Sequence, residues 1–230
     1  MKQLIRSALA SAGMLQQVEH KRRRGLESAL IASHLTSQGP HKLHIGCGFN
    51  VLPGWLNTDY YPTAPDIAHL DATKPFPFED ATFDFVFSEH MIEHIPYPDG
   101  CNMLRECCRV LKPGGVVRIS TPNLSFLIEL YGGKTDQQRQ YIEWSKQNFI
   151  PWAAEANDTF VINNFMHDWG HCFIYDEKAL RQAMGNAGLR DIVRCEIQKS
   201  SKTELRDLEN EQRAPAGFLR LETLTMEGTR

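Results

Sequence analysis

The sequence lacks any apolar run that approaches the ~20 residues needed to span a bilayer. It also lacks a convincing secretory leader, because Arg6 interrupts the short apolar stretch that follows Met1 and Lys2. Positive charge is not in excess either, since 25 lysines and arginines stand against 28 aspartates and glutamates, for a net charge of −3. Non-specific nucleic-acid binding depends on neutralising phosphates, so this balance argues against it. We therefore expect no membrane span and no nucleic-acid partner.

Paired cysteine motifs are also missing. The spacing of the six cysteines contains no C-x-x-C pair and no zinc-finger pattern (Cys47, Cys101, Cys107, Cys108, Cys172 and Cys195). The simplest interpretation is a cytoplasmic protein with reduced thiols.

What is present is ordinary for an enzyme: 230 residues, 42% of them hydrophobic and 23% charged. This length predicts one globular domain with additions. Apolar residues recur at helical spacing over residues 1–37, and a loop signal follows at residues 37–40. We therefore divide the chain into an N-terminal helical arm, 1–39, and a main domain, 40–230. The arm is expected to cover the edge of a ligand site or to hold a second copy of the chain.

In the main domain, apolar strands alternate with turns and one amphipathic helix. The predicted strands are residues 43–45, 55–59, 67–70, 83–88 and 116–121. Such alternation implies right-handed crossovers and a parallel sheet that is covered on both faces.

Residues 124–175 interrupt this alternation of strands and helices. They contain a polar helix at 135–149 and the aromatic, amide-rich stretch 163–175. We interpret this segment as an insertion or lid at an acceptor site. A helix capped by Asp176 then restores the pattern. Residues 189–197 and 218–226 are expected to be the last two strands and to form an antiparallel edge hairpin.

The first strand ends in the turn Gly46-Cys47-Gly48, where glycines allow the backbone to approach a ligand closely. Val51 stands where a dinucleotide fingerprint needs its third glycine, which disfavours NAD and FAD. Asp59 ends the second strand, where a carboxylate can accept both hydroxyls of a ribose. The alternative for Asp59 is a turn-forming role before Tyr60 and Tyr61.

Two further strand ends carry polar residues. Asp71 and Ala72 follow the third strand, although Asp71 can also serve as a loop cap. Ser88 and Glu89 lie at the carboxyl end of the fourth strand, where ligands bind in open α/β sheets. Glu93 and His94 follow one turn later.

Taken in order, the glycine turn, the acidic strand ends, the S-x-x-x-x-E-H pattern at residues 88–94 and the L-K-P-G-G turn at 111–115 resemble the class I S-adenosylmethionine-dependent methyltransferases. The resemblance implies a Rossmann-like, doubly wound, mostly parallel seven-stranded sheet with an antiparallel edge hairpin. It implies S-adenosyl-L-methionine as cofactor, with Gly46, Cys47 and Gly48 beside its methionine part. By the same resemblance Asp71 would pair with the adenine amino group and Ala72 would contact the ring.

Catalysis of methyl transfer is mostly a matter of proximity and orientation, so a base is needed only for a protonated nucleophile. Three histidines are candidates for that base, in the order His171, His94 and His167. His167 and His171 are four residues apart beside Asp168, but no third ligand is evident, and we predict no metal site.

For the acceptor we expect a hydroxyl group on a sugar, a glycan precursor or another polar small molecule. No Asn-Pro-Pro-Tyr-like tetrapeptide follows the fourth strand, which disfavours an adenine or glutamine amide. Two alternatives remain open: a non-catalytic cofactor-binding accessory subunit, and a nicotinamide-dependent oxidoreductase.

Overall fold

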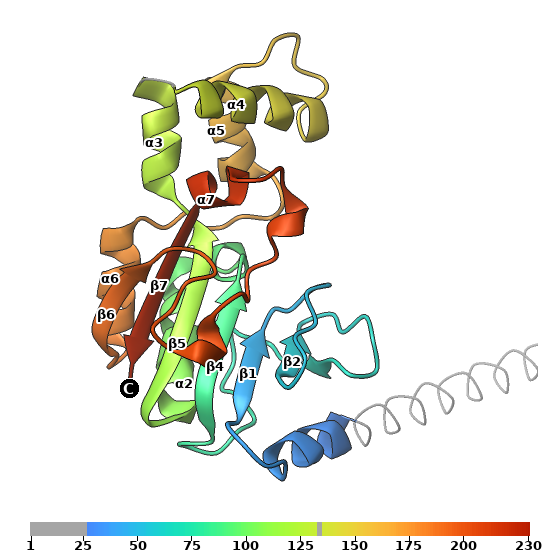
Figure 1. The fold of residues 1–230 in the computed structure, drawn as a ribbon, viewed down its shortest axis with the longest axis vertical. Coiled ribbons are helices and arrows are strands. Elements are labelled where there is room, and N and C mark those ends of the chain that lie inside the picture. The colour runs from blue at the N-terminus through green and yellow to red at the C-terminus, as the bar shows by residue number, and fades with distance from the viewer. Residues whose placement is uncertain (1–26, 133–134) are drawn as a thin grey trace, which may run out of the picture.

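The computed structural model describes residues 27–132 and 135–230, and most of the predicted N-terminal arm lies outside these ranges. One seven-stranded sheet, in the order β3-β2-β1-β4-β5-β7-β6, forms the centre of the molecule (Figure 1). Its strands are β1 (Lys42–Ile45), β2 (Leu56–Asp59), β3 (Ala68–His69), β4 (Phe83–Glu89), β5 (Leu111–Pro122), β6 (Arg190–Cys195) and β7 (Thr223–Thr229). The first five are parallel, and β7 runs antiparallel to both β5 and β6. The predicted sheet is confirmed.

The order of the strands reverses between β1 and β4, which pair directly, with Ile45 opposite Ser88. In open α/β sheets the ligand crevice lies outside the carboxyl ends of the strands at such a reversal. The two strand ends that carry Gly46 and Glu89 therefore meet where a ligand is expected.

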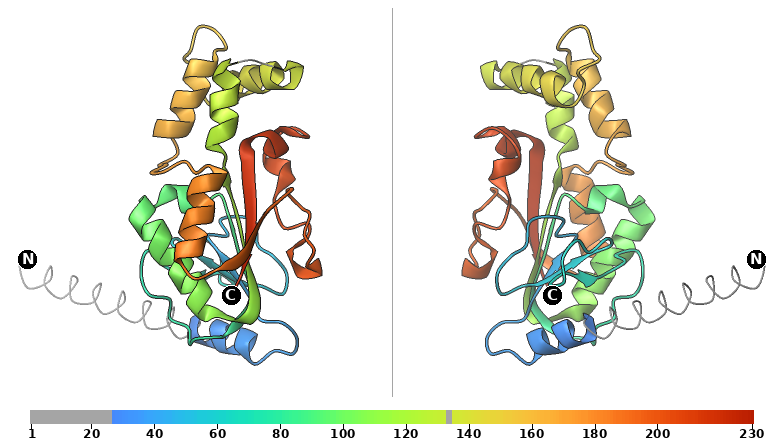
Figure 2. Two further views of the ribbon diagram at one scale, coloured as in Figure 1. Left: turned by 90° about the vertical axis from the view of Figure 1, so that its left-hand side faces the viewer. Right: turned by 90° about the vertical axis from the view of Figure 1, so that its right-hand side faces the viewer.

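The two faces of the sheet are covered differently (Figure 2). On one face lie α2 (Tyr97–Val110) and α6 (Glu177–Asn186), and the helical residues 27–35 pack against the same core. On the other face lies a long connection after β6, with the 3-10 turns η2 (Thr203–Leu205) and η3 (Glu211–Arg213). Leu205 of this connection packs against Trp55 and Phe87.

Three helices stand beyond the carboxyl ends of the strands (Figure 1). They are α3 (Leu124–Gly132), α4 (Asp136–Asn148) and α5 (Asp158–His167), and they share a hydrophobic core of their own. Thr135 and Gln138 form a capping box that begins α4. We call α3–α5 the helical cap. It occupies the segment that the sequence marked as an insertion.

One predicted strand boundary is wrong. Residues 218–226 were expected to be a strand, but Phe218–Glu222 forms the helix α7, and β7 begins only at Thr223. Phe218 packs into the core of the helical cap, so tertiary contacts decide the conformation of this short apolar run. β6 and β7 pair antiparallel with β6 at the edge of the sheet, as expected, and residues 196–222 join them.

A buried ion network fastens this connection to the sheet. Arg118 on β5 is fully buried; its Nε donates to Glu209 Oε1 at 2.7 Å and its Nη1 donates to Glu227 Oε1 at 2.6 Å. Arg118 also donates to the carbonyl oxygens of Glu196 and Lys199. The connection is thereby fixed immediately before Asn210.

Candidate active site

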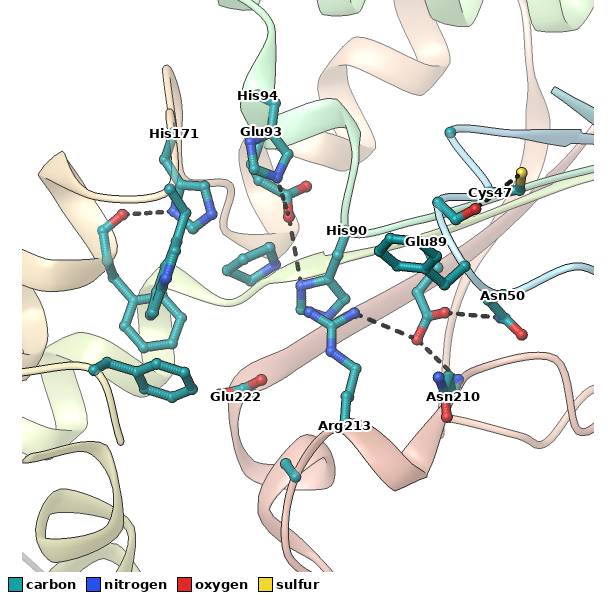
Figure 3. A pocket seen from close by; sticks show the side chains of 18 of the residues that line it. Cys47, Asn50, Glu89, His90, Glu93, His94, His171, Asn210, Arg213 and Glu222 are labelled. Carbon is teal, nitrogen blue, oxygen red and sulfur yellow. Dashed lines mark hydrogen bonds and ion pairs between the residues drawn. The ribbon is translucent and has the colours of Figure 1, made fainter. Parts of the chain in front are cut away.

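A cavity of about 440 Å³ lies between the reversal point of the sheet and the helical cap. Figure 3 shows Cys47, Asn50 and Glu89 on one side of it and His94 and His171 on the other. Its lining comes from the glycine turn, the end of β4 with η1 (Ile92–His94), the cap and the connection before β7: Gly46–Asn50, Glu89, His90, Glu93, His94, Pro122, Tyr141, Trp144, Phe149, Phe165, Trp169, His171, Asn210, Arg213, Ala214 and Glu222.

The glycine turn after β1 requires its glycines for different reasons. Gly46 has φ +68°, and a Cβ there would clash with Cγ of Met91. Gly48 has φ +51° and open space where a Cβ would be. The backbone of Gly48 is therefore accessible to a ligand, as a cofactor cradle requires.

Asp59 holds this turn to the end of β2. Its Oδ2 accepts a hydrogen bond from the backbone N–H of Gly48 at 2.9 Å, and its Oδ1 accepts one from Tyr61 at 2.8 Å. The position beside the turn fits a ribose ligand, and the bond to Tyr61 also fits the turn-forming role. The function of Asp59 in cofactor binding stays a prediction.

Asp71 and Ala72 lie beyond β3 and are not part of the cavity lining. The Oδ1 atom of Asp71 accepts from both the backbone N–H and the hydroxyl of Thr73, and this hydrogen bonding lowers the pKa of Asp71. This is the geometry of a loop cap, and the adenine contact of Asp71 and Ala72 remains a prediction.

The residues at the end of β4 differ in their hydrogen bonding. The hydroxyl of Ser88 is buried and has no hydrogen-bond partner among the described residues. Glu89 accepts from the side chain of Asn50 at 3.2 Å and from the backbone N–H of Asn210 at 3.0 Å. Burial raises the pKa of Glu89. A carboxylate beside the glycine turn suits the positive charge of a sulfonium cofactor.

Cys47 does not supply a nucleophile. Burial, with the charge of Asp59, raises the pKa of its thiol to about 11, so the thiol stays protonated at neutral pH. All six cysteines lie within the described ranges and are free.

Glu93 is the buried centre of the opposite side of the cavity. Its Oε2 accepts from the hydroxyl of Thr121 at 3.0 Å. Its Oε1 faces Nδ1 of His90 at 3.4 Å and Nε2 of His94 at 3.9 Å. Burial by itself would raise the pKa of Glu93, but the nearby imidazoles of His90 and His94 outweigh it and the pKa is lowered.

His171 lies across from this carboxylate, in the loop after α5. Its Nδ1 lies 2.7 Å from the carbonyl oxygen of Phe165, which can only accept. Nδ1 therefore carries the proton, and Nε2 has a free lone pair. Burial lowers the pKa of His171, so the ring is neutral near pH 7.

The fold brings two of the three predicted catalytic histidines together and places the third elsewhere. The rings of His94 and His171 lie 4.9 Å apart, centroid to centroid, and both line the cavity. His167 is exposed on the last turn of α5 and is not among the lining residues. The geometry thus favours His171 and His94 over His167 as groups that reach a reacting molecule.

Aromatic side chains form the wall contributed by the cap. Phe149 and Phe165 pack edge-on against Trp169, with centroids 5.1 and 5.5 Å away, and Trp144 packs edge-on against Phe149 at 5.0 Å. Below them Tyr141 donates a hydrogen bond to Glu222, and burial raises the pKa of Glu222. This half of the cavity is suited to a ring-bearing molecule that also carries polar groups.

Sequence reasoning missed Asn210, Arg213 and Glu222. They lie in a charged connection and in a run taken for a strand, more than 110 residues after the glycine turn that they face. The hydrogen bond of Asn210 to Glu89, the 3.8 Å contact of Arg213 with Glu89 and the hydrogen bond from Tyr141 to Glu222 reveal them, and all three are tertiary contacts.

Comparison with known proteins agrees with this geometry. A family model described as a methyltransferase domain matches residues 32–193, well over half of the chain. The chain belongs to the class I S-adenosylmethionine-dependent methyltransferases. The methyltransferase superposes on an S-adenosylmethionine-dependent methyltransferase from Archaeoglobus fulgidus with a TM-score of 0.51 at 14% identity, covering 90% of this chain and 94% of that one. This likeness concerns the fold.

Two curated relatives match shorter segments. A probable S-adenosylmethionine-dependent methyltransferase of Mycolicibacterium smegmatis is 43% identical over 63 residues, which is 27% of this chain and 23% of the relative. A ubiquinone biosynthesis O-methyltransferase of Azoarcus sp. is 33% identical over 123 residues, 54% of this chain and 43% of the relative. The matches thus span less than half the length of these two relatives.

In residues 27–132 and 135–230, no helix has the length and apolar character required to cross a membrane.

The assignment of Asp59 can be tested directly. Asp59→Ala is expected to weaken binding of S-adenosylhomocysteine by ~1–3 kcal/mol, because charged hydrogen bonds to the ribose would be lost. Isothermal titration calorimetry measures the change. Asp80→Ala is the matched control, since Asp80 is an exposed aspartate in the loop before β4, at the other end of that strand from Glu89. Equal affinities of Asp59→Ala and wild type would remove Asp59 from the cofactor site.

Proposed function

We propose that this methyltransferase transfers a methyl group from S-adenosyl-L-methionine to a hydroxyl group of a sugar, a glycan precursor or another polar small molecule. The observation that carries the proposal is that one cavity joins the glycine turn to a carboxylate–histidine cluster and an aromatic wall. A cofactor and an acceptor bound in its two halves would face each other.

The cofactor would bind along the lining of the cofactor half and reach residues beside it. The backbone at Gly46–Gly48 would lie along the methionine part, with Glu89 near its charge. Asp59 would hold the ribose, and Asp71 with Ala72 would hold the adenine. S-adenosyl-L-methionine supplies a methyl group that is already activated by a positively charged sulfur.

In the acceptor half, the rings of the cap would stack against the face of the acceptor, and Glu222 with Arg213 would bind its polar groups. The acceptor hydroxyl would lie near His171, whose free Nε2 can receive the proton. The oxygen forms the new O–CH₃ bond as the S–CH₃ bond breaks, and the electron pair of that bond stays on sulfur. The products are the methyl ether, S-adenosylhomocysteine and a proton.

Transfer to oxygen is supported by the curated relative named as an O-methyltransferase. A relative named phosphoethanolamine N-methyltransferase 2, from Caenorhabditis elegans, is 33% identical over 91 residues. Its name supports the competing possibility of transfer to nitrogen. The histidine with a free lone pair favours oxygen, because a hydroxyl must lose its proton whereas a neutral amine can react directly. A cytoplasmic location and assembly through the N-terminal arm remain predictions.

The test is to incubate the full chain with methyl-labelled S-adenosyl-L-methionine and parallel panels of sugars, nucleotide sugars, phenols and amines. We expect labelled methyl ethers from the hydroxyl panels and thermal stabilisation by S-adenosylhomocysteine but not by NAD. Label found only on amines would contradict the proposal. Stabilisation without transfer to any acceptor would favour the accessory-subunit alternative.

A further inference from the structure

Glu93, His94 and His171 form a group whose ligand atoms, one per residue, all lie within 4.8 Å of one another. The group brings together two segments that are far apart in the chain: η1 supplies Glu93 and His94, and the loop after α5 supplies His171. The backbone N–H groups of Cys172 and Phe173 both donate to the carbonyl oxygen of Glu93, at 2.7 and 3.2 Å. Main-chain hydrogen bonds therefore hold the three side chains together independently of any ligand.

An unsatisfied atom lies in the middle of this group. Glu93 is fully buried, and its Oε1 has no hydrogen-bond partner among the described residues. A buried carboxylate oxygen without a partner is costly, and native proteins seldom keep one without a reason. His90 Nδ1 at 3.4 Å and His94 Nε2 at 3.9 Å offset part of that cost, but neither nitrogen donates to Oε1 at hydrogen-bond geometry.

The groups behind the cluster orient it as the outer partners of a metal site do. The hydroxyl of Thr121 donates to Glu93 Oε2, which leaves Oε1 facing the histidines. The carbonyl oxygen of Phe165 fixes Nδ1 of His171, which leaves Nε2 free. Metal-binding histidines and carboxylates in proteins are held by such second contacts.

We propose that Glu93, His94 and His171 bind a divalent transition-metal ion, with zinc as the best match. Two imidazoles and one carboxylate, with a fourth position open to the cavity, is a donor set found in catalytic zinc sites. Bonds of about 2.0–2.1 Å in a tetrahedral site place the ligand atoms about 3.3 Å apart. The distance of 3.9 Å between His94 Nε2 and Glu93 Oε1 is near this value, so modest side-chain rotation closes the site. The sequence-based prediction of no metal site is thereby replaced by this proposal.

The existence of the site does not depend on the proposed function, but its catalytic use does. The ion would polarise an acceptor oxygen bound at its open fourth position, and it would make that hydroxyl more acidic. In that state His171 Nε2 is a ligand and not the base, and the proton leaves to solvent through the open cavity. His171 is essential in either case, whereas His94 is essential only if the ion is bound.

The site is tested with Zn²⁺ alone, titrated into the full chain after removal of bound metal, in competition with a chromophoric chelator. We expect one ion per wild-type chain and at least about 100-fold weaker binding in His94→Ala and in His171→Ala. Thr121→Val, which alters only the support of Glu93, should bind about 10-fold more weakly. His167→Ala and Cys172→Ser should bind as wild type, which would exclude an exposed histidine and the nearby thiol as ligands.

Circular dichroism and S-adenosylhomocysteine binding show whether each variant is folded. His94 is 38% exposed at its side chain, so His94→Ala keeps the core intact and decides the question if another variant unfolds. Wild-type affinity for Zn²⁺ in a folded His94→Ala variant, or no stoichiometric binding by the wild type, would overturn the proposal. Zinc binding that is intact in a protein that transfers no methyl group would instead refute only the proposed function.

Discussion

Replacing His171 by Ala is expected to lower turnover by ~10²–10⁴-fold while the affinity for S-adenosylhomocysteine stays nearly unchanged. His171 lies beside Glu93 and His94 at the wall of the cavity, and the hydrogen bond of its Nδ1 to the carbonyl oxygen of Phe165 orients the ring and leaves Nε2 free. Removal of the ring takes away the lone pair without touching the glycine turn or Asp59. Steady-state kinetics with the best acceptor, together with calorimetry, measure the two effects.

His167→Ala is the matched control, because His167 is only four residues earlier but exposed. It should keep near-native turnover and cofactor affinity. Near-native turnover in a folded His171→Ala variant would remove His171 as the base, and near-native turnover in the His94→Ala and His167→Ala variants as well would mean that orientation alone drives the reaction. Addition of a strong chelator to the wild type then separates two roles: activity that survives chelation identifies His171 as the base, and activity that is lost and restored by Zn²⁺ identifies it as a ligand.

The sheet and the cofactor half could be predicted because their determinants are local. A buried run such as Leu43–Ile45 followed by Gly46 specifies a strand and a turn within a few residues. The same holds for β4, which is apolar along most of its length and ends at Glu89. Because parallel strands place their carboxyl ends at one edge, the order of the strands along the chain is enough to group their terminal residues into one site.

The acceptor half could not be predicted in the same way, because its groups meet only in three dimensions. His171 and His167 share a short segment, so the sequence suggested them as a pair, whereas the fold pairs His171 with Glu93 and His94. Glu222 lies in an apolar run that fits a strand, and only the core of the cap makes it helical. Arg118 interrupts a buried strand, and nothing in its neighbourhood of the sequence indicates that Glu209 and Glu227 would neutralise it.

This arginine supports the last prediction. Arg118→Met is expected to lower the free energy of unfolding by about 3–5 kcal/mol, because it leaves the carboxylates of Glu209 and Glu227 buried without their cation. Urea denaturation followed by circular dichroism measures the change. In Arg194→Met the lost pair with Glu177 is exposed, so the cost should be only about 0–1 kcal/mol. Equal losses of unfolding free energy in the two variants would show that the buried network stabilises the fold no more than an exposed ion pair does.

Arg118→Met should also affect the active site. Asn210 follows Glu209 and its backbone N–H donates to Glu89, so loosening the connection should also weaken cofactor binding.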